Sequence, residues 1–323
     1  MSLDFRSMLH SPAESSTAYA TYYENLTKFP GIKWGISSLD KHMIPLRPGD
    51  VMGIIARPGH GKSTLSAYLA RKTARDILAR QSKTECVVYV TFEQSIEEIE
   101  AFFQIDEAQY SVTDFAMGKV DKNVVLRGAI KRMNLPVWLV GKSMMKRGRI
   151  PTMTVSNVYR AIQTLEEDNG IKPTLIIIDY IQIVPVEKQS EKVQQVGEAI
   201  DRAKTELAMN CGCPVILCVQ ASRAVDKSKS KIPTAADCQW SSAIEQASDK
   251  LFGIWRPILT EKTELNAEKV KVRVNGNQID VTSNLLIVKL LKQRFAAAGQ
   301  IFPLHFAPEY VRLADIELVD QHV

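Results

Sequence analysis

The sequence predicts an α/β fold in which helices flank a mostly parallel central sheet, followed by antiparallel strands near the C-terminus. Three observations support this prediction. A strand, a tight glycine-containing loop and a helix follow one another over Val51–Thr64. Apolar runs then alternate with helical patterns as far as Gln220, and a pattern of paired, alternating strands begins near residue 270. Alternation of this kind is typical of a parallel sheet with helices on both faces.

The first of these segments has the form of a phosphate-binding P-loop, and it reads VMGIIARPGHGKST. Gly59 and Gly61 can adopt the backbone angles that turn N–H groups toward phosphate oxygens, and Lys62 can reach the β- and γ-phosphates. The Ser63 hydroxyl can ligate magnesium. We therefore expect ATP and Mg²⁺ here; the simpler alternative is a chance GKS in an ordinary loop. The expected nucleotide contacts are Ala56, Arg57, Pro58, Gly59, His60, Gly61, Lys62, Ser63 and Thr64.

Strand and helix patterns continue in alternation after the P-loop. Strands are expected at Cys86–Phe92, Val137–Val140, Thr174–Tyr180 and Pro214–Gln220. Helices are expected at Lys62–Arg80, Ile96–Phe103, Val155–Glu167 and Glu191–Asn210. In an open parallel sheet, ligands bind at the carboxyl ends of the strands. Side chains that follow these strands are therefore the first candidates for chemistry.

The C-terminal third has the pattern of antiparallel strands. Two alternating runs, Val270–Val274 and Gln278–Thr282, flank Asn275-Gly276, which is a strong hairpin signal. We expect a further strand at Leu285–Phe295, paired with Ile301–Phe306. The hairpin lies within an insertion, 258–284, for which the sequence indicates no role.

Composition indicates an ordinary globular protein rather than a membrane or disulfide-rich one. The 323 residues are 45% hydrophobic and 24% charged, with a net charge of +5 that permits a nucleic-acid partner without arguing for one. The five cysteines show no paired CxxC spacing, so buried free thiols are expected. We find no signal peptide and no window of about 18 apolar residues, and expect a cytoplasmic protein without a membrane contact.

Polar side chains follow three of the predicted strands. Asp179 ends a run of apolar residues, as a Walker B acid does, and would hold the magnesium with Ser63. Glu93 follows the strand before it and is suited to orient and polarise an attacking water. Gln220 ends another strand and would sense the γ-phosphate by hydrogen bonding. Taken alone, Asp179 is also explained as a strand-end acid that caps the next turn, and Gln220 as an uninformative polar residue at a strand end.

Phosphoryl transfer also needs cations that stabilise the developing charge. Lys62 supplies one. Lys292 and Arg294 alternate along the predicted strand in Lys292-Gln293-Arg294. Considered alone, this pair is better explained as a solvated strand face.

Together these residues resemble the RecA-like motor domain of DnaB-type replicative helicases, over roughly 31–317. The motifs that carry the resemblance are ARPGHGKST, VTFEQS, LIIIDYIQIV, CVQASR, SSAIEQASD and KQR, in this order. Ala56 in place of the first P-loop glycine is ordinary in that family. The family's N-terminal primase-binding domain has no counterpart here, so the closest architecture is the stand-alone helicase of some plasmids and phages. Residues 1–30 would form an arm, frayed or docked on a neighbouring subunit, and 318–323 a tail.

The resemblance implies an ATP-dependent ring, usually of six subunits, that moves 5′ to 3′ on single-stranded DNA during replication, with a loader or primase as a further partner. By the same resemblance, Lys292 and Arg294 act on the neighbouring subunit's nucleotide as the piston lysine and arginine finger. Loops that line the channel would grip DNA. The expected DNA contacts are Lys188, Lys192, Arg223, Gln239, Trp240 and Ser242.

Two departures from the family pattern bear on these expectations. In the second DNA loop, Gln239, Trp240 and Ser242 stand where the family carries Arg, Glu and Gly, so Trp240 would stack on a base or, equally, pack in the core. After KQR, Phe295-Ala296 replaces the usual Asn-Gly.

Three functions compete at this point. The leading one is an ATP-dependent DNA helicase or single-strand translocase. The second is an ATP-gated assembly ATPase of a mobile element or defence system, which binds DNA or a partner and unwinds nothing. The third, a small-molecule kinase, leaves the KQR strand without a purpose. Unwinding of a forked substrate with a free 5′ tail separates the first two.

Overall fold

The computed structural model describes residues 9–28, 30–108, 110–145, 148–185, 192–238, 241–261 and 270–316. Within these residues, nine strands form one sheet in the order β11-β10-β9-β6-β1-β5-β4-β2-β3, and two form a separate hairpin, β7-β8. The strands are β1 (Val51–Ala56), β2 (Glu85–Thr91), β3 (Val137–Val140), β4 (Lys172–Asp179), β5 (Val215–Gln220), β6 (Lys250–Trp255), β7 (Lys271–Val274), β8 (Asn277–Asp280), β9 (Leu285–Gln293), β10 (Ile301–Ala307) and β11 (Arg312–Asp315).

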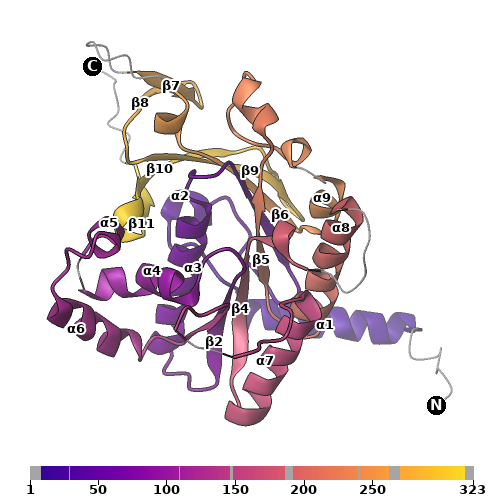
Figure 1. The fold of residues 1–323 in the computed structure, drawn as a ribbon. Helices are drawn as coiled ribbons and strands as arrows, with labels where there is room; N and C mark the ends of the chain where they lie inside the picture. Colours follow the sequence, from indigo (N-terminus) through magenta and orange to yellow (C-terminus); the bar gives the residue numbers. More distant parts are fainter. Residues whose placement is uncertain are drawn as a thin grey trace.

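Helices cover both faces of the sheet, as Figure 1 shows. One side carries α3 (Lys62–Ala79), α4 (Ile96–Ala108), α5 (Val112–Ala116) and α6 (Lys122–Arg132). The other carries α7 (Val155–Asn169), α8 (Lys192–Arg202) with its π-helical continuation η3 (Ala203–Met209), and α9 (Ser241–Ala247). The short helix α2 (Ser37–Asp40) precedes β1. The α/β fold with a mostly parallel sheet is therefore confirmed.

The core divides into two layers because successive strand residues point to opposite faces. On β1, Met52 and Ile54 pack in the layer that includes Leu65 of α3, whereas Val51 and Ile55 belong to the layer that includes α8. All six residues of β1 are buried, as expected for a central strand covered on both sides. The strand that leads into the P-loop is thus covered on both faces and paired with a strand on each side.

Parallel register brings the carboxyl ends of the central strands to one edge of the sheet. Ala56 of β1 is paired with Gln220 of β5 and with Ile254 of β6. Thr91 of β2 is paired with Asp179 of β4. We call this edge, which carries the P-loop, the P-loop edge.

The C-terminal strands extend the sheet in the antiparallel sense, which confirms the predicted pairing of the 285–295 and 301–306 segments. Strand β9 runs antiparallel to β6, so Gln293 lies opposite Lys250, at the start of β6. The end of β9 therefore reaches the edge of the sheet opposite the P-loop. We call it the finger edge, since Arg294 follows there.

The predicted hairpin at Asn275-Gly276 is confirmed as β7–β8. Both turn residues have positive φ, 51° and 87°, as a two-residue turn of this kind requires. The hairpin packs its buried Val272 and Val274 with Trp255 in a small separate core.

Several elements differ from the expectations. Strand β6, in the middle of the sheet, was not expected. Its lysine and glycine interrupt the apolar run by which a buried strand is recognised. Gly253 is required there because a Cβ would lie 2.1 Å from the carbonyl oxygen of Pro233. Strand β11 was not expected, the helix predicted over 191–210 becomes π-helical from Ala203, and the strand predicted over 285–295 ends at Gln293.

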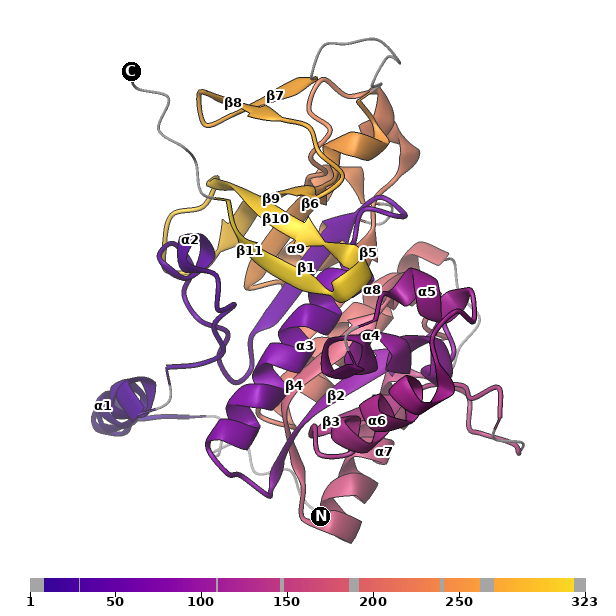
Figure 2. The ribbon, with the colours of Figure 1, turned by 90° about the vertical axis from the view of Figure 1, so that its left-hand side faces the viewer.

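Helix α1 (Pro12–Lys28) projects from one side of the protomer (Figure 2), and none of its residues is fully buried. Its Tyr22 lines a cavity together with Arg47 and Phe295 of the body. Tyr19, Tyr22 and Tyr23 are all more than half exposed. The helix covers most of the arm expected at residues 1–30.

All five cysteines are free, and four of them are buried, as predicted. Among the described residues, no helix is long and apolar enough to span a bilayer.

Candidate nucleotide site

The P-loop has the backbone that its glycines predicted. Gly59 and Gly61 have φ of 78° and 88°, values that side-chain-bearing residues rarely adopt. Helix α3 begins directly afterwards at Lys62, so its N-terminal amides face the loop. Gly61 is also needed for space, because a Cβ there would lie 2.6 Å from the Phe306 ring. This nest of amides at a helix start suits a phosphate group.

Two side chains of the loop, Arg57 and His60, tie it to neighbouring segments. The Arg57 guanidinium pairs with both carboxylate oxygens of Asp226 at 3.0 Å and donates to the Ala221 carbonyl oxygen at 3.1 Å. His60 is buried, and its Nδ1 accepts a hydrogen bond from the Arg256 amide at 3.1 Å. Arg57 is thus tied to the segment after β5 through its side chain, and the phosphate contact expected of it remains a prediction.

Burial, and after it the positive charges of Arg256 and Arg57, together lower the pKa of His60 to about 4. The imidazole is therefore neutral at pH 7, as its role as hydrogen-bond acceptor requires.

Lys62 and Asp179 face one another across the site, with Nζ 3.8 Å from Oδ1. Asp179 is buried, and its other oxygen accepts a hydrogen bond from Tyr89 at 2.9 Å. Burial and the Asp179 charge raise the pKa of Tyr89, so its hydroxyl remains a donor. Lys62 also lies 4.4 Å from the centre of the Tyr180 ring.

Glu93 and Gln220 lie at the same edge. Glu93 is exposed and follows β2. Burial of Tyr180 raises the pKa of its hydroxyl, and the charge of Glu93 raises that pKa in the same direction. Gln220 is held through its backbone: Gln182 donates to its carbonyl oxygen at 2.8 Å and accepts from its amide at 3.0 Å. The sheet therefore brings together the P-loop, Asp179, Glu93 and Gln220.

The donor set fits Mg²⁺ bound with a nucleotide better than a metal held by protein alone. Ser63 and Asp179 are the expected ligands, and in the part of the chain that the structure describes no three His, Cys, Asp or Glu residues gather as a metal site. Magnesium bound with phosphates needs only one or two protein oxygens.

Lys292 and Arg294 lie at the finger edge. The Arg294 Nε is 3.0 Å from Asp249 Oδ1, and Lys292 donates to the Glu245 carbonyl oxygen. The six residues of β1 separate this edge from the P-loop, roughly 20 Å at the rise of a strand. Neither side chain is placed to reach the P-loop of its own protomer.

The sequence model described as "DnaB-like helicase C terminal domain" matches residues 31–315. The chain belongs to this family. The resemblance read from the six motifs is thereby confirmed.

Relatives named "Replicative DNA helicase DnaB" include that of Leifsonia xyli subsp. xyli, 28% identical over 84% of this chain and 57% of the relative. That of Mycoplasma genitalium is 26% identical over 70% of this chain and 46% of the relative. This DnaB-like chain thus spans about half the length of the curated relatives it matches.

Two solved structures share the fold of this DnaB-like domain. One, titled as an ATPase domain, matches with a TM-score of 0.75 at 17% identity, covering 95% of this chain and all of that one. "The Structure Of A DnaB-Like Replicative Helicase And Its Interactions With Primase" matches with a TM-score of 0.73 at 18% identity, covering 94% and 67%. The fold is that of RecA-like DnaB ATPase domains.

The expected DNA contacts of the DnaB-like chain are described only in part. Lys188, Gln239 and Trp240 lie outside the described residues. Lys192 and Ser242 lie in the first turns of α8 and α9, and their side chains are not described. Arg223 is exposed at the start of a 3-10 turn, η4 (Arg223–Lys227), after β5. These contacts remain predictions.

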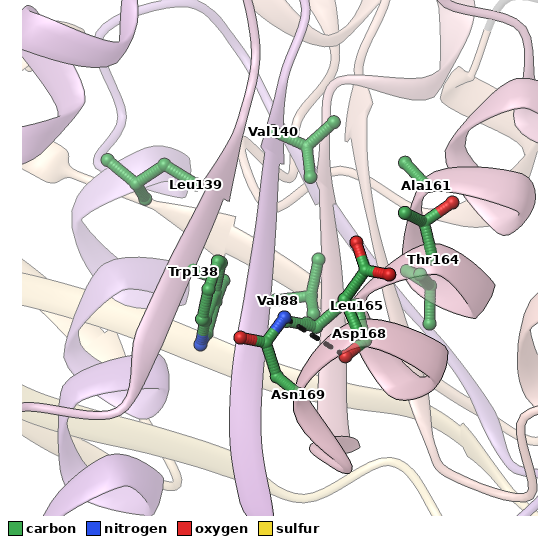
Figure 3. Close-up of a pocket in the computed structure, with 10 residues that line it drawn as sticks. Val88, Trp138, Leu139, Val140, Ala161, Thr164, Leu165, Asp168 and Asn169 are labelled. Carbon is green, nitrogen blue, oxygen red and sulfur yellow. Dashed lines mark hydrogen bonds between the residues drawn. The ribbon is translucent and has the colours of Figure 1, made fainter.

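A groove of about 280 Å³ lies elsewhere, between the edge strand β3 and helix α7 (Figure 3). Trp138 and Leu139 line it from β3, and Leu165 and Asn169 line it from α7. No predicted site residue is among its lining residues.

Sequence reasoning missed four residues of the candidate site: Tyr89, Gln182, Asp226 and Arg256. Tyr89 lies inside a predicted strand and Gln182 inside a predicted motif, so their polarity within buried runs was an available signal. For Asp226 and Arg256 the sequence offered none.

Proposed function

We propose that this chain is the motor of an ATP-dependent DNA helicase that translocates 5′ to 3′ on single-stranded DNA as a ring, in DNA replication. The observation that carries the proposal is the division of the catalytic side chains between opposite edges of one sheet. Lys62, Asp179 and Glu93 lie at one edge, and Lys292 and Arg294 at the other. A complete site would then need two protomers, as in a closed ring or an open helical assembly.

At the P-loop edge, the family membership and the geometry support these roles. Lys62 would hold the β- and γ-phosphates of ATP, and Ser63 and Asp179 would hold Mg²⁺, which neutralises phosphate charge. Glu93 would orient the attacking water and accept its proton, and Gln220 would sense the γ-phosphate.

At the finger edge, Arg294 and Lys292 of one protomer would stabilise the charge that develops on the nucleotide of the next. Helix α1 supports the same assembly, because a helix of 17 residues, none of them fully buried, is marginal in water by itself. We infer that α1 docks on a neighbouring protomer, most simply in a ring of six.

Single-stranded DNA would pass through the ring, with Arg223, Trp240 and the other expected contacts lining the channel. Because one solved relative is titled for its interactions with primase, we extend to this chain the expectation of a primase or loader partner. The chain would act in the cytoplasm, with no membrane contact.

A forked DNA substrate with a free 5′ tail tests the proposal. With ATP and Mg²⁺ we expect strand separation, dependence on the 5′ tail, and a ring in negative-stain images. Hydrolysis stimulated by single-stranded DNA without strand separation would instead support an ATP-gated assembly ATPase. Hydrolysis by a monomer at the full rate would overturn the ring.

A further inference from the structure

The finger edge contains a charge cluster that the proposed mechanism does not yet use. Asp249, at the start of β6, is surrounded by Lys204 and Arg294. A second pair, Asp50 and Lys250, lies beside it. From this cluster we propose that Asp249 is a positioning residue for the arginine finger; the inference rests on the proposed function.

Asp249 is itself held rigidly. Its side chain is 5% exposed, and Oδ2 accepts from the Val51 amide at 2.8 Å and from Lys204 Nζ at 2.6 Å. Its own amide donates to the Val51 carbonyl oxygen at 2.7 Å. The carboxylate is therefore fixed to the first residue of β1, the strand that leads into the P-loop.

Asp249 holds Arg294 at two points. The Arg294 amide donates to the Asp249 carbonyl oxygen at 3.0 Å, and Nε lies 3.0 Å from Oδ1. Nε is nearer the backbone than the two Nη groups. This contact therefore fixes the aliphatic part of the Arg294 side chain and leaves the two Nη groups free of Asp249. The Arg294 side chain is still 54% exposed, so its distal end remains accessible to a second protomer.

The cluster also preserves the positive charge of the finger. Two cations, Lys204 and Arg294, share the single carboxylate of Asp249, so the three groups together remain positive. A lone Asp249–Arg294 pair would instead be neutral and would stabilise a phosphoryl transition state less well. Fixing the long arginine before the reaction also removes rotamer freedom that catalysis would otherwise have to restrict.

Asp249→Asn tests this role. The amide oxygen of Asn can still accept from the Val51 amide, but the ion pairs with Arg294 and with Lys204 are both lost. We expect kcat for DNA-stimulated ATP hydrolysis to fall about 10-fold, with KM for ATP and the ring mass unchanged. Asp50→Asn is the matched control: it removes a neighbouring, largely buried ion pair at the same edge without touching Arg294. It should cost stability, as loss of a buried pair does, but the turnover of the folded ring should stay within about twofold.

Mixed rings separate positioning from a merely structural role. An Asp249→Asn protomer keeps its own P-loop, and a Lys62→Ala protomer keeps an intact finger. In a mixture, some Asp249→Asn sites receive a finger from a Lys62→Ala neighbour, so turnover should rise several-fold above the sum of the separate variants. A structural defect inside the Asp249→Asn protomer would not be repaired. If that variant does not fold, Asp249→Glu keeps the charge, displaces the carboxylate by one methylene, and should show the same repair.

Wild-type kcat in Asp249→Asn, or an equal loss in Asp50→Asn, overturns the positioning role and leaves the proposed function intact. Wild-type turnover in Arg294→Ala overturns the proposed function, and the positioning role with it. Loss in both Asp249→Asn and Arg294→Ala, with repair in mixed rings, supports both.

Discussion

The two edges of the central sheet hold their charged side chains in different ways. At the P-loop edge, Lys62 and Asp179 face each other with side chains 14% and 5% exposed. At the finger edge, the Arg294 side chain is 54% exposed, and the next residue, Phe295, is 92% exposed. One edge encloses its charges within the protomer, and the other presents a cation and an aromatic ring to the outside.

This difference indicates how a site split between protomers can be built. In the proposed ring, the half that would bind phosphate needs fixed amides and a fixed lysine, which the buried strand β1 and the start of α3 supply. The half that would act on a neighbour must stay accessible, and Asp249 holds only the Nε of the Arg294 side chain. Substitutions at one edge should therefore affect ATP turnover and nucleotide binding differently from substitutions at the other.

Arg294→Ala breaks the finger edge and has the largest expected effect. ATP turnover should fall by about 10³-fold or more, because a trans-acting arginine contributes that much in other phosphoryl-transfer enzymes. Nucleotide binding should persist, since Arg294 lies at the edge opposite its own P-loop. Steady-state turnover on single-stranded DNA and a nucleotide titration check both halves of this prediction. Unchanged turnover would show that Arg294 has no role in the reaction.

Lys62→Ala breaks the P-loop edge, and turnover should fall by about 10²–10³-fold. Unlike the finger variant, it should also weaken nucleotide binding, because Lys62 would contact the ground-state phosphates. Equilibrium binding of a fluorescent ATP analogue distinguishes the two variants. Identical binding defects in Lys62→Ala and Arg294→Ala would contradict a division of roles between edges.

The P-loop edge could be predicted almost entirely from the sequence. Its groups follow strands in contiguous motifs, and parallel register then forces Ala56, Asp179 and Gln220 to one edge. What could not be predicted there are contacts across long stretches of chain. Tyr89 reaches Asp179 over 90 residues, and His60 meets the Arg256 amide over 196.

The finger edge could be predicted only through the family resemblance. Taken alone, the pattern of Lys292 and Arg294 indicates a solvated strand face. Their contacts, Glu245 and Asp249, lie just before β6, and the glycine and lysine of that strand obscured its apolar pattern. Once β6 is in the sheet, antiparallel register brings Asp249 beside Arg294. Gln293, between the two cations, anchors the end of β9 by donating to the carbonyl oxygens of His42 and Ala297.

His60 gives a pH test that concerns the P-loop edge alone. Its pKa is lowered to about 4 in the folded chain, against about 6.5 when unfolded, so the unfolded chain binds its proton first as the pH falls. The contribution of neutral His60 is fully present above pH 6.5 and is lost between pH 6.5 and 4, by up to about 3 kcal/mol.

Urea unfolding at several pH values, compared with His60→Asn, measures this term. Asn keeps an acceptor for the Arg256 amide but does not titrate, so its stability curve should be flatter over that interval. Parallel curves for the two proteins would show that His60 titrates normally.

Gln239→Ala/Trp240→Ala should affect neither edge. Stacking of one base on an aromatic ring contributes about 1–3 kcal/mol, so single-stranded DNA affinity should fall about 10-fold or more while ATP affinity is unchanged. Fluorescence anisotropy at fixed salt measures the former, and Gln239→Ala, which keeps the ring, is the control. Unchanged DNA affinity together with a lower melting temperature would assign Trp240 to the core.

Substitution of Phe295 should give the smallest change in stability of these variants. It tests directly whether the exposed side chains at the finger edge contact a neighbouring protomer. Its φ of 66° is unfavourable for an aromatic residue, and its ring gains almost nothing from burial in the protomer. Phe295→Gly should therefore stabilise the isolated protomer by about 1 kcal/mol, because glycine adopts this angle without strain. Phe295→Asn, which restores the family's usual residue and also tolerates the left-handed region, should give part of the gain.

The same two variants should weaken ring assembly if the ring of Phe295 is covered by a neighbouring protomer. Urea unfolding of dilute protomer and mass measurement of the ring separate the two effects. A more stable protomer with weaker assembly would mean that the backbone strain is retained for the interface beside the finger. A more stable protomer with unchanged assembly would mean that Phe295 stays in solvent in the ring as well, and that Arg294 alone reaches across.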